Sequence, residues 1–331
     1  MLRLNLRIPA VSQWLLGVAL LLPMQVLRAQ DGDAQNLLLR MSAAIRSLNY
    51  QGTFVYERDG QIDALRLFHE GGGEGERERL VSMNGPRSEV LRDGNSVTCH
   101  QAGVVGVVFP SQNGARLLPL VPDTHAPKFA TFYALRVGRD ERVAGYDAHI
   151  VDVLPRDSYR YGYRLWLDRG TSMLLRSAVV DGAGRALEQF MFVALDIGAK
   201  PMESDLAFST GLGPLSAPDE IGLDGPPRWR ATDLPPGFGF LRGQRPALGP
   251  TQVEHHTYTD GVANVSVYIE PRDPTLPALP DRVSTRGVLS IYSRSNGGWT
   301  ITALGDVPRA TVQRIAQSMQ AAPPGPAARA P

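Results

Sequence analysis

The stretch from Glu78 to Cys99 constrains the fold more than any other part of this chain. It places short runs of alternating apolar and polar residues around two tight turns, Asn84-Gly85-Pro86 and Asp93-Gly94-Asn95. Turns this short join antiparallel neighbours as hairpins and leave no room for a crossover helix. The sequence therefore predicts a meander of antiparallel strands here.

The composition is that of an ordinary globular protein, long enough for two domains. The chain has 331 residues, of which 43% are hydrophobic and 20% are charged. Its net charge is +1, with 34 basic against 33 acidic residues. We therefore predict no nucleic-acid partner, because a protein that grips phosphates through its overall surface carries a clear basic excess.

The N-terminus has the pattern of a secretory signal peptide. Arg3 and Arg7 supply positive charge, Trp14–Leu22 is a short apolar run, and Ala29 offers a small residue for cleavage after the break at Pro23. The apolar run is much shorter than the roughly 20 residues of a membrane-spanning helix. We predict a signal peptide over 1–29 and export across the membrane, with a retained anchor as the alternative.

The remaining chain predicts a mainly antiparallel β protein of the α+β class in two unequal domains. An amphipathic helix over Gln35–Leu48 opens the mature chain. We expect a large domain over 30–200, a Pro- and Gly-rich linker over 201–228, a smaller C-terminal domain over 229–322 and a disordered tail over 323–331.

Strands are predicted wherever apolar and polar residues alternate between turn signals. In the first domain these are Gly52–Glu57, Ile62–His69, Arg79–Val81, Glu89–Arg92, Val97–Cys99, Val104–Phe109, Ala148–Leu154, Tyr159–Asp168, Met173–Val180 and Ala186–Leu195. In the second they are Val253–Tyr258, Asn264–Glu270, Gly287–Ser293 and Trp299–Leu304. Further helices are expected over Phe129–Val137 and Pro308–Met319.

Residue patterns typical of catalysis are missing from the sequence, so we predict that the protein is not an enzyme and holds no cofactor or metal. There is no HExxH, GxSxG, Walker A or CxxC motif. His255 and His256 are adjacent, and neighbouring side chains on a strand point to opposite faces. Cys99 is the single cysteine, and we expect it to be buried in a packing gap between strands.

The first domain's sheet is expected to curl around a helix and to keep a concave apolar face. The ten side chains predicted to line this face are Phe54, Tyr56, Leu65, Leu67, Val81, Leu91, Val97, Tyr163, Leu165 and Leu167. Two interpretations stay open. These residues either fill a closed core or line a hollow that takes a ligand.

Several long strings resemble the MucB/RseB family of periplasmic negative regulators of the sigma-E (AlgU-type) envelope-stress response. They are Glu78–Cys99, Tyr50–Glu57 (YQGTFVYE), Leu65–Glu70, Tyr258–Glu270 (YTDGVANVSVYIE) and Gly287–Met319. The resemblance covers nearly the whole mature chain and places Cys99 where the family's pattern has it.

The resemblance implies a LolA-like half-open barrel, followed by a smaller α+β domain that binds a partner. It also implies a function. Such a protein binds the periplasmic segment of a membrane anti-sigma factor of the RseA/MucA type, shields it from site-one proteolysis and so restrains sigma-E. Lipopolysaccharide or another lipid is expected to release it, and in mucoid pseudomonads the system restrains alginate production. A lipid or lipoprotein carrier of the LolA kind is the alternative.

Two further groups of residues are candidates for binding. Basic residues that would meet lipid phosphates at the rim of the hollow are Arg66, Arg77, Arg79, Arg92 and Lys128, although each also suits a solvated strand position. Aromatic residues that would contact the anti-sigma factor, or else pack in the core, are Tyr258, Tyr268 and Trp299. The sequence leaves the oligomeric state open, a homo-oligomer included.

Overall fold

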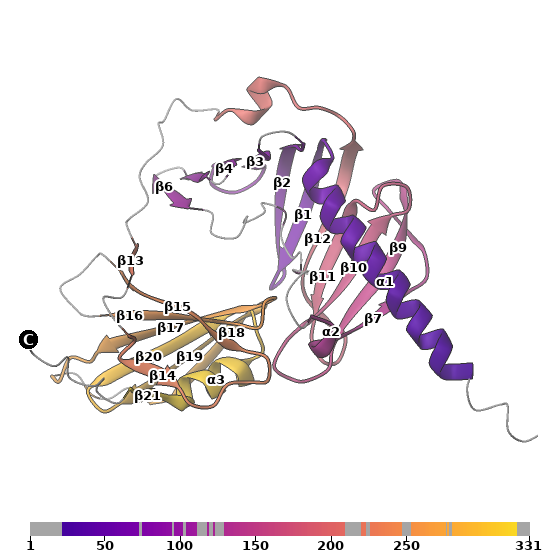
Figure 1. Ribbon diagram of the computed structural model, residues 1–331. Coiled ribbons are helices and arrows are strands. Elements are labelled where there is room, and N and C mark those ends of the chain that lie inside the picture. Colours follow the sequence, from indigo (N-terminus) through magenta and orange to yellow (C-terminus); the bar gives the residue numbers. More distant parts are fainter. Residues whose placement is uncertain are drawn as a thin grey trace, which may run out of the picture.

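The computed structural model describes residues 22–322 apart from 73–74, 95, 102–103, 111–117, 119–121, 123–128, 209–219, 223–225, 247–252, 276 and 278–279. Side chains of 22–31, 101–110, 220–222 and 246 are also outside the description. Two antiparallel sheets, each with a helix against one face, make up most of this part of the chain (Figure 1). The predicted fold class is confirmed.

The large sheet has twelve strands and two meanders that meet at its centre. The first meander is β1 (Tyr50–Arg58), β2 (Gln61–Glu70), β3 (Arg77–Ser82), β4 (Ser88–Asp93), β5 (Ser96–Gln101) and β6 (Val104–Pro110). The second comprises β7 (Tyr133–Val137), β8 (Glu141–Val143), β9 (Tyr146–Pro155), β10 (Gly162–Asp168), β11 (Leu174–Val180) and β12 (Ala186–Ile197). The meanders join where β1 pairs with β12, and we call β3–β6 the wing.

Helix α1 (Leu22–Ser47) covers one face of the second meander (Figure 1). Its buried side chains recur at helical spacing, as the sequence predicts, and they are Ala34, Leu37, Leu38, Met41 and Ile45. They pack against apolar side chains from β1, β9, β10 and β12. The helix begins well before the predicted Gln35, and the predicted cleavage point at Ala29 falls within it. Residues 1–21 lie outside the described part.

The predicted helix over Phe129–Val137 is wrong for most of its length. Only Phe129–Phe132 forms the short helix α2, and from Tyr133 the chain continues as β7 and pairs with β9. Three aromatic residues close together suggested a helix that packs on the sheet. Instead, the Phe129 and Tyr133 rings stack directly, with centroids 4.9 Å apart.

The smaller sheet has seven strands, and its helix α3 (Arg309–Ser318) lies on one face (Figure 1). Its strands are β13 (Glu220–Gly222), β15 (Gly239–Pro246), β16 (Glu254–Thr259), β17 (Asn264–Pro271), β18 (Arg282–Arg286), β19 (Leu289–Asn296) and β20 (Trp299–Gly305). A separate antiparallel pair, β14 (Trp229–Ala231) with β21 (Met319–Ala321), lies beside α3. Apolar side chains from the sheet, α3 and this pair form the second core.

The predicted linker over 201–228 contains two short elements. The 3-10 helix η1 (Glu203–Leu206) packs on β2 and β3, and β13 extends the smaller sheet. The domain boundaries at 200 and 229 therefore stay a proposal, since each end of the segment is attached to the sheet nearest to it. In the described residues, each helix is too short or too polar to cross a membrane.

Candidate functional site

Seven of the ten predicted lining residues lie in or against the core beneath the large sheet. Phe54, Leu67, Leu165 and Leu167 are completely buried in it. Tyr56, Leu65 and Tyr163 are half-buried and pack against it. The same core holds the apolar stripe of α1, so protein side chains occupy this part of the predicted hollow.

Two of the ten predicted residues lie on the opposite face of the sheet, which corrects the prediction. Leu67 pairs with Leu80, and that pairing puts Leu80 on the core face. Val81 pairs with Arg66 and Leu91 pairs with Arg79, so both point away from Leu67. A shift of one residue in the pairing register moves every side chain of a strand to the opposite face. The alternation of apolar and polar residues does not fix that register.

Val97 completes the set, and it is buried on β5 within the wing. It pairs with Arg92 and thus shares the face that carries Leu80. Two surface hollows, of about 330 and 470 Å³, occur elsewhere, beside the pairing of β1 with β12 and beside α3. None of the ten predicted residues lines either hollow, so lipid binding by these residues stays a proposal.

The core face of the wing carries a buried group of charged and polar side chains. The Nε of Arg92 lies 3.0 Å from Oε2 of Glu78, and Glu76 also pairs with this guanidinium. His69 lies beside them, with Nδ1 2.8 Å from the Leu48 carbonyl oxygen. Burial lowers the pKa of His69 to about 4, so its imidazole is neutral at pH 7.

Most of the predicted rim cations take part in ion pairs of the protein itself. Arg92 is buried as described, and Arg79 is buried beside Glu89 with Nη2 3.1 Å from its Oε2. Of the four predicted rim cations that the structure describes, Arg66 is the exposed one, with its guanidinium 5.0 Å from the Phe68 ring centroid. Lys128 lies outside the described residues. Arg79 and Arg92 are therefore structural cations and not free phosphate ligands.

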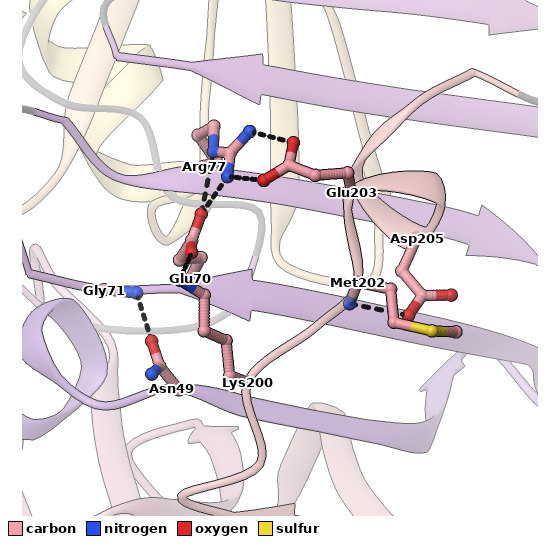
Figure 2. Close-up of polar contacts among 8 residues, drawn as sticks. All are labelled: Asn49, Glu70, Gly71, Arg77, Lys200, Met202, Glu203 and Asp205. Atoms are coloured by element: carbon pink, nitrogen blue, oxygen red, sulfur yellow. Dashed lines mark hydrogen bonds and ion pairs between the residues drawn. The ribbon is translucent and has the colours of Figure 1, made fainter.

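Arg77 joins the wing to η1, as Figure 2 shows. Its guanidinium donates to Glu203 at 2.8 Å and also to Glu70, which in turn lies 2.9 Å from the Lys200 ammonium. Asp205 accepts from the Met202 amide at 3.0 Å and so caps η1. These contacts lower the pKa values of Glu70 and Glu203. The chain leaving the first sheet is thus fastened to the outer face of β2 and β3.

The three predicted partner contacts occupy different places. Tyr258 is buried in the second core, the alternative that the sequence left open, and its hydroxyl accepts from the Ala231 amide at 3.2 Å. Trp299 is half-buried and meets the Trp229 ring edge-on. Tyr268 lies on the other face of the sheet, stacked on His255 with centroids 4.3 Å apart.

The face that carries Tyr268 is the one opposite α3, and we call it the open face. Strand register places on it a set of hydroxyl-bearing side chains, namely Thr257, Ser266, Ser293, Thr300 and Thr302. Ser293 and Thr302 hydrogen-bond across strands at 3.0 Å, and His255 lies 3.0 Å from Ser266. Ser266, Ser293, Thr300 and Thr302 are half-buried, whereas Thr257 is buried.

The two sheets meet where the turn between β18 and β19 reaches Glu188 of β12. The Glu188 carboxylate accepts from the Val288 amide at 3.0 Å and from the Tyr56 hydroxyl. The Gly287 amide donates to Asp59, in the β1–β2 turn, at 3.0 Å. Gly287 has a φ of +56°, and a Cβ there would overlap the Glu188 carboxylate.

Cys99 is half-buried, which is less than predicted, and burial raises the pKa of its thiol. A raised pKa disfavours the reactive thiolate and so argues against a redox role. His256 is buried and lies 3.0 Å from Glu254, whereas His255 faces the open side, as strand alternation predicts. Across the described ranges, no group of three or more His, Cys, Asp or Glu is arranged to hold a metal ion.

Comparison with known proteins matches both halves of the chain to one family. Residues 33–210 match the MucB/RseB N-terminal domain, and residues 224–320 match the MucB/RseB C-terminal domain. The sigma factor AlgU regulatory protein MucB of Pseudomonas aeruginosa is 36% identical over 307 residues, which are 90% of this chain and 94% of MucB. The sigma-E factor regulatory protein RseB of Escherichia coli K12 is 27% identical over 290 residues, 86% of this chain and 89% of RseB.

Solved structures agree with this match. A crystal structure of MucB in complex with MucA(peri) has a TM-score of 0.70 at 32% identity, and covers 87% of this chain and 99% of that one. The Pseudomonas aeruginosa MucA/MucB complex has a TM-score of 0.72 at 33% identity, with the same coverage. The two-sheet arrangement described here is therefore similar to that of MucB in structures solved together with MucA.

Proposed function

Because this chain belongs to the MucB/RseB family, we propose that it binds the periplasmic segment of a membrane anti-sigma factor of the RseA/MucA type. By covering that segment it shields the anti-sigma factor from site-one proteolysis and restrains sigma-E activity. It acts in the periplasm after export by the predicted signal peptide. Lipopolysaccharide or another lipid releases the anti-sigma factor.

The single observation that carries this proposal is the pair of relatives solved with MucA. Both cover nearly nine-tenths of this chain at 32–33% identity. Their superposition spans both sheets, so the proposal concerns the whole two-sheet protein. A lipid carrier would not need the smaller sheet, and for that reason we favour a regulator over a carrier of the LolA kind.

We assign partner contact to the open face of the smaller sheet, with Tyr268 as its aromatic anchor. Tyr is enriched among residues that dominate binding energy, because it adds a large apolar ring with a polar tip at little entropic cost. Tyr268 meets this description and is half-buried beside His255. Tyr258 does not, since its ring lies inside the core.

Release by lipid requires that lipid binds the partner-free protein more tightly than the complex. A ligand with equal affinity for both would shift nothing. An acyl chain can supply the difference, since each buried CH₂ contributes about 0.8 kcal/mol. The apolar core around α1 and the large sheet is the candidate site, and an incoming chain has to displace side chains that now fill it.

The decisive experiment mixes the full-length mature protein with the isolated periplasmic segment of MucA and measures binding calorimetrically, with and without lipopolysaccharide. We expect binding that lipopolysaccharide weakens, together with protection of the segment from a site-one protease. Absence of binding would refute the regulator. Transfer of lipid between membrane vesicles without any MucA binding would instead establish the carrier.

A further inference from the structure

A buried arginine joins the two sheets at the end of the large one. Arg160, in the connection between β9 and β10, has a side chain with no exposed surface. Its Nη2 donates to the Pro236 carbonyl at 2.6 Å, and its Nη1 lies 3.2 Å from Oδ2 of Asp260. Asp157 supplies a second carboxylate at 3.2 Å. Removing a buried charge of this kind from its partners is costly, so the contact holds the sheets together.

Aromatic rings from helix α2 and from the residue before β15 enclose this guanidinium. Its carbon lies 4.2 Å from the Phe132 ring centroid and 5.5 Å from that of Phe238, distances at which a cation is attracted to a ring. Gly237 packs so closely on Phe132 that a Cβ at this position would overlap the ring. We call this set of contacts around Arg160 the joint, and it is tightly packed as well as charged.

At the joint, a turn of the smaller sheet reaches the core beneath the larger sheet. In the β16–β17 turn, Oδ1 of Asp260 accepts from the Val262 amide at 2.9 Å and from the Ala263 amide at 2.8 Å. Val262 packs against the same core cluster that contains Tyr133, Phe129 and the α1 stripe. The smaller unit thus supplies part of the wall of the apolar core in the larger unit.

We propose that this turn, with Val262 at its tip and held in place by Arg160, is a movable wall of the core. It moves when a ligand occupies the core, and it thereby couples that occupancy to the relative position of the two sheets. The proposal rests on the lipid arm of the proposed function and gives it a mechanism. An acyl chain that enters the core takes space beside Tyr133 and displaces Val262. Displacement of the turn separates Asp260 from Arg160 and frees the smaller sheet from the larger one.

Thermodynamic linkage makes the proposal testable without any anti-sigma factor. If an acyl chain favours the loosened joint, a joint that is already loosened must bind the acyl chain more tightly, and by the same factor. In the closed protein, part of the acyl chain's binding energy is used to break the joint. Two substitutions loosen it in different ways.

Asp260→Asn removes the charge that faces Arg160 and keeps the Oδ1 atom that the turn amides require. Gly237→Ala inserts a methyl group against Phe132 and leaves every charge in place. Gly184→Ala is the matched control. Gly184 also has a positive φ, +79°, but has no heavy atom near its absent Cβ, so it adds the same kind of backbone strain without a wedge.

The measurement is the affinity of the full-length mature protein for dodecanoate, by calorimetry, alongside small-angle scattering of the free proteins. We expect Asp260→Asn and Gly237→Ala to bind dodecanoate about tenfold more tightly than wild type, within the usual range of coupling between sites. Gly184→Ala should bind as wild type does. Dodecanoate binding by Asp260→Asn and Gly237→Ala, with none by wild type, would support the proposal equally.

Equal dodecanoate affinity in wild type and both loosened variants would overturn the proposal, as would absence of binding by all of them. A gain shared by Gly184→Ala would also overturn it, because strain alone would then explain the effect. MucA binding without lipid is measured separately on the same proteins. Its failure would refute the proposed function, and the dodecanoate comparison would still decide whether the wall exists.

Discussion

Arg92 and Glu78 form an ion pair, 3.0 Å apart, inside the wing, where their side chains are 3% and 1% exposed. The pair lies on the core face of β3 and β4, which in most sheets is apolar. Its presence shows that the wing is specified by matched charges as well as by hydrophobic packing. One partner without the other would be a buried, unbalanced charge.

Arg92→Met should therefore lower the free energy of unfolding by about 3–5 kcal/mol, because it strands Glu78 in the interior. The double variant Arg92→Met/Glu78→Gln should lose clearly less, since it removes both charges. Urea unfolding of the three proteins measures this. A double variant that is less stable than Arg92→Met would mean that the pair itself does not explain the loss.

Acid should destabilise the protein through His69. Its pKa is about 4 in the folded state and about 6.5 in an unfolded chain, so the unfolded state binds a proton first as pH falls. The contribution is complete above about pH 6.5 and is lost towards pH 4, with a total of about 3 kcal/mol. His69→Phe should remove this part of the pH dependence in urea unfolding at pH values between about 7.5 and 4.5. An identical slope in wild type and variant would contradict the prediction.

Substitutions of Tyr268 and Tyr258 should affect different properties of the protein, MucA binding for Tyr268 and folding stability for Tyr258. Tyr268→Ala is expected to weaken MucA binding by tenfold or more, about 1.4 kcal/mol, because it removes the aromatic anchor of the open face. Tyr258→Phe should leave binding unchanged and cost about 1 kcal/mol of stability, because the Ala231 amide loses its acceptor. Calorimetric titration and thermal unfolding of both variants check this. The reverse pattern would place the partner on the α3 side.

Gly287 should tolerate a side chain much less well than Gly297 does. Both have positive φ values, +56° and +60°, so alanine strains the backbone at either site by about 1–2 kcal/mol. Only at Gly287 does the added Cβ overlap the Glu188 carboxylate, whereas nothing lies near it at Gly297. We expect a larger fall in melting temperature for Gly287→Ala, with a larger radius of gyration by small-angle scattering. Matched values for the two variants would show that the Glu188 contact is not tightly packed.

Alternation of apolar and polar residues was enough to predict most long strands, because half-buried strands show a clear period of two. The predicted Ile62–His69 is β2 within two residues, and Asn264–Glu270 is β17 within one. Strands without a buried face escaped detection. All five residues of β18 are exposed, and β8 has only three residues, so neither shows a period.

The candidate site was only partly predictable, for a different reason. Composition indicates that Leu67 and Val81 both suit a buried face, but pairing between β2 and β3 puts them on opposite faces. Similarly, the charges of Arg79 and Arg92 suggested exposure, and only the fold reveals Glu89 and Glu78 as their partners. Long-range register and pairing are not local properties of a sequence. The joint made by Arg160 was missed because its partners in the smaller unit, Pro236 and Asp260, lie 76 and 100 residues further along the chain.

The pairing of β1 with β12 has a consequence for how the protein acquires its structure. Each meander is built from neighbours in the chain and can form early from local contacts, whereas this pairing matches Tyr50 with Ile197. Contacts of such large sequence separation form slowly, since a long loop must close first. Assembly of the large sheet should therefore end with the pairing of β1 and β12, after each meander has formed and the chain is available as far as Ile197.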